Sequence, residues 1–104
     1  MITENKIRHV ASLISSKFKP KKIILFGSCA KGKITKDSDI DLLVIKKGES
    51  GSNRELAVKM HSSLWGQKVP VDIIVKSESQ FEKDKNYFWS VSYAAAKEGR
   101  VIYG

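Results

Sequence analysis

Three short, mostly apolar runs limit what this chain of 104 residues can fold into. They are residues 23–26 (IILF), 40–45 (IDLLVI) and 69–75 (VPVDIIV). The first run is too short for a core helix and is rich in residues that favour β-structure, so it predicts a buried strand. Residues 40–45 predict a second buried strand, and residues 69–75 predict a third strand. Between the runs lie helical patterns and polar, glycine-rich stretches. This alternation predicts an α/β fold in which helices pack on one small sheet.

The predicted helices are marked by apolar spacing and by capping residues. Thr3 precedes apolar side chains at helical spacing, and Pro20 follows them. Two serines each stand three residues before a Glu or Gln, which is the spacing of a capping box. We therefore expect helices over 4–18, from Ser52 to Gly66, just after Ser77, and over 87–98, with a terminal extended segment at 101–103.

Composition sets the class of protein. The length predicts a single domain, residues 1–104, without room for a separate substrate-binding domain. No apolar run approaches a membrane span, and the first residues lack the apolar core of a signal peptide, so we expect a cytoplasmic protein. The lone Cys29 agrees with a reducing compartment. The net charge of +8 favours polyanionic partners, but scattered lysines fit a solvated surface equally well.

Two aspartates begin the second predicted strand. Asp39 and Asp41 are two residues apart, so on a strand their side chains point to the same face, about 6.5–7 Å apart along the backbone. Like charges at this distance repel each other unless a cation lies between them, and Mg²⁺ prefers such carboxylate oxygens. The alternative is a solvated turn, with Asp37 or Ser38 capping the chain.

A third aspartate lies in the last apolar run. Asp72 interrupts VPVDIIV, where burial of an unpaired carboxylate would cost several kcal/mol. If this strand lies beside residues 40–45, Asp72 can face Asp39 and Asp41 and complete a group of three carboxylates. The alternative is a salt bridge from Asp72 to one of the lysines.

A glycine-serine pair follows the first predicted strand. Gly27 permits a tight turn and a close backbone approach, and Ser28 begins the next helical turn, where free N–H groups can bind phosphate oxygens. Lys31 adds positive charge nearby. Together with the aspartates, these residues predict a phosphate site beside a metal site, as nucleoside triphosphate chemistry requires.

These motifs carry a resemblance. The segment GSCAKGKITKDSDIDLLVI, residues 27–45, resembles the G-S-x-A-R-G-x-x-x-x-x-S-D-I-D-L signature of the minimal nucleotidyltransferases, which belong to the DNA polymerase β-like superfamily. VDIIV, residues 71–75, resembles the strand that carries the third carboxylate of that family. The resemblance implies a small mixed β-sheet covered by helices. Lys31 stands in place of the arginine of the signature and lacks its bidentate fork.

The resemblance also implies roles for the residues. Gly27 and Ser28, with Lys31, would hold the phosphates of the nucleotide, for which ATP is the expected donor. Asp39, Asp41 and Asp72 would bind two Mg²⁺ ions. The reaction implied is an in-line displacement in which an acceptor hydroxyl attacks the α-phosphorus and pyrophosphate leaves. Asp72 is the expected proton acceptor.

The acceptor is open to three hypotheses. Free-standing minimal nucleotidyltransferases resemble the antitoxins of modules whose toxin is a HEPN-domain ribonuclease, which implies AMP transfer to a tyrosine of that toxin. This would make the chain a protein adenylyltransferase in a hetero-oligomer, with a homodimer possible when it is alone. The second hypothesis is a non-catalytic antitoxin that occludes the same partner. The third is a nucleotidyltransferase for a small molecule or RNA, although nucleic acid is not favoured.

Aromatic residues are the remaining candidates for contacts. The rings of Trp65, Phe88, Trp89 and Tyr93 could stack on a nucleotide, but their helical spacing favours the core or a partner contact. Phe81, Tyr87 and Tyr103 are expected to form an exposed apolar patch that meets the partner.

Overall fold

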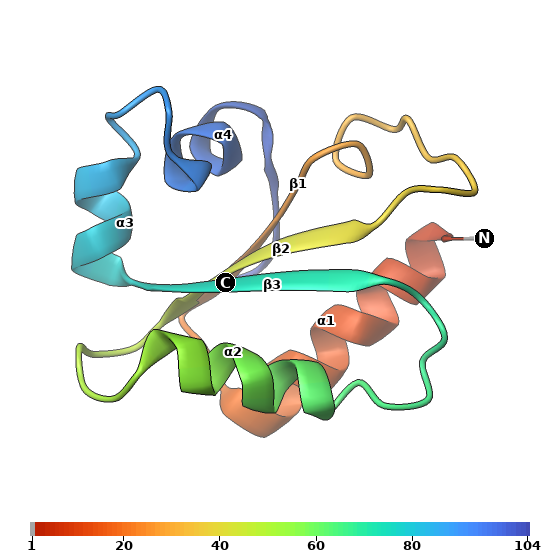
Figure 1. Ribbon diagram of the computed structural model, residues 1–104, viewed down its shortest axis with the longest axis horizontal. Coiled ribbons are helices and arrows are strands. Elements are labelled where there is room, and N and C mark those ends of the chain that lie inside the picture. The colour runs from red at the N-terminus through yellow and green to blue at the C-terminus, as the bar shows by residue number, and fades with distance from the viewer. Residues whose placement is uncertain (1) are drawn as a thin grey trace.

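The fold is a four-stranded mixed sheet with two helices on each face (Figure 1). The computed structural model describes residues 2–104. The strand order is β3-β2-β1-β4, with β2 parallel to β3 and both other pairs antiparallel. The predicted α/β class with a small mixed sheet is therefore confirmed. The elements in chain order are α1 (Glu4–Phe18), β1 (Lys22–Phe26), β2 (Ile40–Lys46), α2 (Asn53–Ser62), β3 (Val71–Ser77), α3 (Glu78–Asp84), α4 (Val91–Glu98) and β4 (Arg100–Tyr103).

The two central strands are buried on both faces, which explains why their apolar runs are continuous. Alternate residues of β2 belong to different cores. Leu42 and Val44 pack toward α1 and α2, whereas Leu43 and Ile45 pack toward Phe81 of α3 and the residues around α4. In Figure 1, α1 and α2 lie below the sheet and α3 and α4 above it. The upper helices cover only one end of their face, and the connection between β1 and β2 rises at the other end.

Local capping places most of the helix starts. The hydroxyl of Thr3 accepts a hydrogen bond from the Lys6 N–H, and Ser52 and Ser77 cap α2 and α3 in the same way. The predicted helix over 4–18 is confirmed. Two boundaries are wrong: α2 ends at Ser62 rather than near Gly66, and β3 begins at Val71 rather than Val69 because Pro70 has no N–H to donate to a neighbouring strand.

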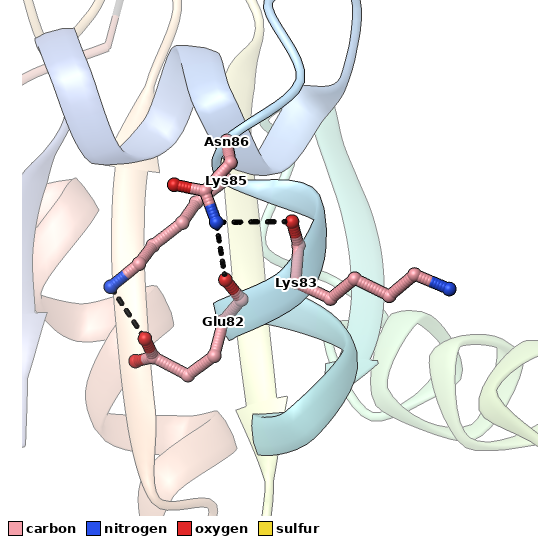
Figure 2. A network of polar contacts seen from close by, with 4 residues as sticks. All are labelled: Glu82, Lys83, Lys85 and Asn86. Atoms are coloured by element: carbon pink, nitrogen blue, oxygen red, sulfur yellow. Dashed lines mark hydrogen bonds and ion pairs between the residues drawn. The ribbon is translucent and has the colours of Figure 1, made fainter.

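The prediction of one helix over 87–98 is also wrong. Figure 2 shows how α3 ends: the Asn86 side-chain amide donates to the carbonyls of Glu82 and Lys83, and Lys85 pairs with Glu82 at 2.5 Å. The two bonds from Asn86 satisfy carbonyl groups that a helix end leaves free. The last helix starts only at Val91, after Ser90.

We predict that Ser90→Ala destabilises the junction between α3 and α4. The Ser90 hydroxyl accepts from the Tyr93 N–H at 3.0 Å and donates to the Asp84 carbonyl at 2.6 Å. Losing both bonds should lower the free energy of unfolding by about 1–2 kcal/mol. Urea denaturation checks this value, with Ser16→Ala, at an exposed position of α1, as the control. Equal stabilities of the two variants would contradict the assigned cap.

The aromatic residues are distributed differently from the prediction. Trp65, Phe88 and Trp89 are 92%, 76% and 71% exposed, so none of them is a core residue. Phe81 is buried and cannot belong to an exposed patch, whereas Tyr87 and Tyr103 are partly exposed. Phe88 and Trp89 are outside the core because residues 87–90 are a turn, and a partner contact of the exposed rings stays a prediction. Among residues 2–104, no helix is both long and apolar enough to cross a membrane.

Candidate active site

Sheet register brings the carboxylates together. Asp41 on β2 is paired directly with Asp72 on β3 and with Phe26 on β1, so the three residues form one row across the sheet. Paired residues on neighbouring strands point their side chains to the same face, and Asp39 joins them from two residues before Asp41. This is the face of α3 and α4, since Phe26 packs with that core. The prediction that the strand of Asp72 lies beside residues 40–45 is confirmed.

Asp72 lies at the surface, so the cost of burying an unpaired carboxylate does not arise at this position. Asp72 is exposed because β3 is an edge strand and the helices leave its part of the sheet uncovered. The alternative of a salt bridge from Asp72 to a lysine is also not found within residues 2–104. The energetic cost of burying an unpaired charge therefore applies more to Asp41 than to Asp72, since Asp41 is half-buried between its neighbours on β1 and β3.

The three carboxylates interact electrostatically. The pKa of Asp41 is raised, first by partial burial, then by the charges of Asp72 and Asp39, and further by hydrogen bonding to Asp72. Burial, followed by the charges of Asp41 and Asp39, raises the pKa of the Cys29 thiol. Carboxylates whose charges raise the pKa of a neighbour in this way also attract metal cations.

We predict that Asp41→Asn stabilises the fold at pH 7 in the presence of EDTA. Because the pKa of Asp41 is raised above its ordinary value of 3.8, the folded state binds the proton more tightly than the unfolded state. Wild-type stability therefore falls as pH rises above 3.8, whereas the variant loses this dependence. The variant should melt a few degrees higher at pH 7 and match the wild type at pH 3. Thermal melts at both values check this, and a lower melting temperature at pH 7 would contradict it.

The turn after β1 has the features of an anion site. Successive hydrogen bonds run from Ala30 N to Gly27 O, from Lys31 N to Ser28 O and from Gly32 N to Cys29 O. They form the short helical turn that was predicted. Within residues 2–104, the N–H groups of Ser28 and Cys29 donate to no protein acceptor. Free N–H groups at the start of a helical turn are suited to bind phosphate oxygens.

Gly27 has a second function that spacing alone does not reveal. Its φ of +74° is in the left-handed region, and a Cβ atom built there would lie 2.3 Å from Oδ2 of Asp41. No side chain fits at Gly27 without moving that carboxylate. The glycine therefore allows the turn after β1 to approach the carboxylate of Asp41 closely.

Lys31, which was expected beside a phosphate, forms an ion pair within the protein. Its ammonium group pairs with Glu98 at the end of α4, at 2.8 Å, and both side chains are about half exposed. A phosphate at this turn would have to compete with Glu98 for Lys31. An exposed pair of this kind contributes little to stability, so the competition is weak.

The connection between Gly27 and Asp39 is held by local bonds. The Cys29 thiol, which is buried as expected of a space-filling residue, donates to the Asp39 carbonyl at 3.1 Å. The Ser38 hydroxyl accepts from the Thr35 N–H at 2.8 Å. Ser38 thus caps the loop, as the alternative interpretation of this segment proposed, while Asp39 remains exposed on the carboxylate side.

The donor atoms fit a magnesium ion. Carboxylate oxygens are the ligands that Mg²⁺ prefers, and those of Asp39, Asp41 and Asp72 lie on one open face of the sheet. Across residues 2–104, no three acidic, histidine or cysteine side chains are already arranged as a metal-binding group. Closure around a cation therefore requires a side-chain rotation, which the exposed Asp39 and Asp72 have room to make.

Comparison with known proteins decides the family. The nucleotidyltransferase domain family matches residues 7–102. The chain belongs to this family. The nucleotidyltransferase is also 37% identical to a Methanocaldococcus jannaschii protein provisionally named protein adenylyltransferase MJ0604, over 99% of this chain and 100% of the relative. The predicted class of enzyme and the resemblance are thereby confirmed.

Solved structures agree with this assignment. A nucleotidyltransferase of Sulfolobus solfataricus is 26% identical, with a TM-score of 0.61 over 93% of this chain and 76% of that one. A toxin-antitoxin structure with AMP-PNP is 25% identical, with a TM-score of 0.56 over 99% of this chain and 74% of that one. A structure of the toxin-antitoxin MntA-HpeT with an altered tyrosine is 26% identical, with a TM-score of 0.52 over 100% and 74% of the two chains.

Proposed function

We propose that this nucleotidyltransferase transfers AMP from ATP to a hydroxyl group of a toxin protein and so acts as its antitoxin. The observation that carries the proposal is the direct pairing of Asp41 with Asp72, beside the phosphate-binding turn at Gly27. The full-length relative named as a protein adenylyltransferase supports the acceptor class. The toxin-antitoxin structure with AMP-PNP supports both the nucleotide and the kind of partner.

In the proposed reaction, each group has a task. The N–H groups at Ser28 and Cys29 hold phosphate oxygens of ATP, and Lys31 leaves Glu98 to join them. The acceptor oxygen forms a bond to the α-phosphorus, while the bond from that phosphorus to the bridging oxygen of the β-phosphate breaks. The acceptor proton passes to the Asp72 carboxylate, and pyrophosphate leaves.

The proposal includes magnesium. Asp39, Asp41 and Asp72 would hold the two ions, which supply positive charge to offset that of the carboxylates and the triphosphate. This requirement gives a reason for the fold to keep Asp39 and Asp72 near Asp41, although their charges raise the pKa of Asp41. The proposal takes residues 1–104 as one nucleotidyltransferase domain that works in the cytoplasm, where ATP and Mg²⁺ are present.

The proposed partner is a HEPN-domain toxin, and the proposed acceptor is one of its tyrosines. The net charge of +8 suits a partner with an acidic surface. The two other hypotheses are occlusion of the toxin without catalysis, and transfer to a small molecule or RNA.

Intact-mass spectrometry tests the proposal. The chain is mixed with the HEPN-domain toxin, ATP and Mg²⁺, and we expect the toxin to gain the mass of one or more adenylyl groups. Asp41→Asn should produce no gain. If the toxin is bound and silenced without a mass gain, occlusion replaces the proposed function. If the toxin is not bound at all, a small-molecule or RNA acceptor replaces it.

A further inference from the structure

The outer edge of β3 has free backbone groups beside the third carboxylate. Within residues 2–104 the sheet order is β3-β2-β1-β4, so β3 pairs with β2 alone, and in Figure 1 it crosses the front of the molecule. The Ile40 N–H donates to the Pro70 carbonyl at 2.9 Å. Since backbone groups of a parallel strand point alternately toward and away from one neighbour, Asp72 bonds to β2, whereas Val71 and Ile73 direct N–H and C=O outward.

A groove runs along this edge. It has a volume of about 310 Å³ and lies between β3 and α2. Val58, on its α2 side, is an apolar side chain that is 58% exposed. The residues that line it include Arg54, Val58 and His61 of α2, and Val71, Asp72 and Ile73 of β3.

We propose that an extended segment of the partner protein binds here as an added strand and delivers the acceptor hydroxyl to Asp72. The occupant is a polypeptide because only a backbone offers both donors and acceptors at the spacing of the free groups on Val71 and Ile73. Nucleic acids and small-molecule substrates have no such ladder. This inference rests on the proposed function and selects a protein as the acceptor.

Register explains how the acceptor reaches the site. A residue opposite Asp72 on the added strand would extend the row formed by Phe26, Asp41 and Asp72, about 4.8 Å further along the sheet. Its side chain would point to the same face as both carboxylates. A hydroxyl-bearing side chain at that one position would stand next to the proposed proton acceptor, whereas its neighbours in the segment would point into the groove toward Val58.

Charge favours an acidic segment. Arg54 lines the groove, and Arg54 and Lys59, together with one acidic residue, Glu55, line the adjoining hollow on the outer side of α2. Neither side chain forms an ion pair with any acidic residue among residues 2–104. Carboxylates that flank the acceptor residue would therefore find free cations along the groove.

Ile73→Pro tests the inference, with Ile73→Ala as its matched control. Proline removes the outward N–H of Ile73, and edge strands tolerate proline at such positions because no bond within the sheet is lost. Alanine removes more side chain but keeps the N–H. We expect Ile73→Pro to slow AMP transfer to the toxin at least about tenfold relative to Ile73→Ala, with ATP binding unchanged. Equal rates for the two variants would overturn the inference.

Hydrogen exchange gives a second measurement that needs no variant. In the wild-type chain, the N–H groups of Val71 and Ile73 should exchange rapidly and should become at least about tenfold slower when the toxin is bound. If the toxin binds and these amides remain fast, the inference fails. Protection that appears in the chain alone and grows with its concentration would assign the edge to a second copy, which also overturns it.

The two measurements separate the inference from the proposed function. If wild-type chain transfers no AMP but the amides of Val71 and Ile73 become protected on binding, the proposed function fails and the docking edge stands. If the chain transfers AMP without protection of these amides, the proposed function stands and the docking edge fails.

Discussion

Asp41→Asn is expected to lower the rate of AMP transfer by about 10³-fold, equivalent to about 4 kcal/mol of transition-state stabilisation. Asp41 is central among the three carboxylates, because it is paired with Asp72 across the sheet and lies two residues from Asp39. Asparagine keeps the shape but removes the charge that a divalent cation requires. The rate is measured by the appearance of adenylylated toxin at saturating ATP and Mg²⁺.

The matched control is Asp37→Asn. Asp37 is exposed in the same connection between β1 and β2, and its substitution changes the net charge equally. Asp37→Asn should keep wild-type activity because Asp37 is not one of the three carboxylates of the site. Asp41→Asn, which is also expected to be stabilised at pH 7, would then be a more stable but inactive protein. Similar losses in both variants would show that overall charge, rather than the site, matters.

Gly27→Ala is expected to lower AMP transfer by about 10²-fold, because the new methyl group has to displace the Asp41 carboxylate. The built Cβ lies 2.3 Å from Oδ2 of Asp41, and a displacement at the reacting centre is costly even when the fold survives. The backbone also opposes the change, since φ is +74° and alanine in the left-handed region costs about 1–2 kcal/mol of stability.

Gly32→Ala separates these two effects. Gly32 has nearly the same φ, +73°, but a Cβ atom there would meet no atom within 4 Å. Both variants should lose similar stability in urea denaturation, and only Gly27→Ala should lose activity. If Gly32→Ala is equally inactive, backbone strain in the turn is the cause, and the assigned contact between Gly27 and Asp41 is wrong.

Features that depend on near neighbours could be predicted from the sequence. The continuous apolar runs of β1 and β2 predicted strands buried on both faces, and the serines at 52 and 77 predicted helix starts. These features are local because a strand period or a cap involves residues only a few positions apart. Residues 87–90 are the exception, since they form a turn and α4 begins only after Ser90, whose hydroxyl donates to the Asp84 carbonyl.

The sequence by itself determined which residues could form the site: three aspartates, a glycine-serine turn and a lysine, in a pattern that the family assignment supports. Only the tertiary structure decided their arrangement. The register that pairs Asp41 with Asp72, the exposure of Asp72 on an edge strand and the pairing of Lys31 with Glu98 join segments far apart in the chain. The physical reason is that strand order and register follow from the packing of the two cores on opposite faces of the sheet, and no local pattern encodes that packing.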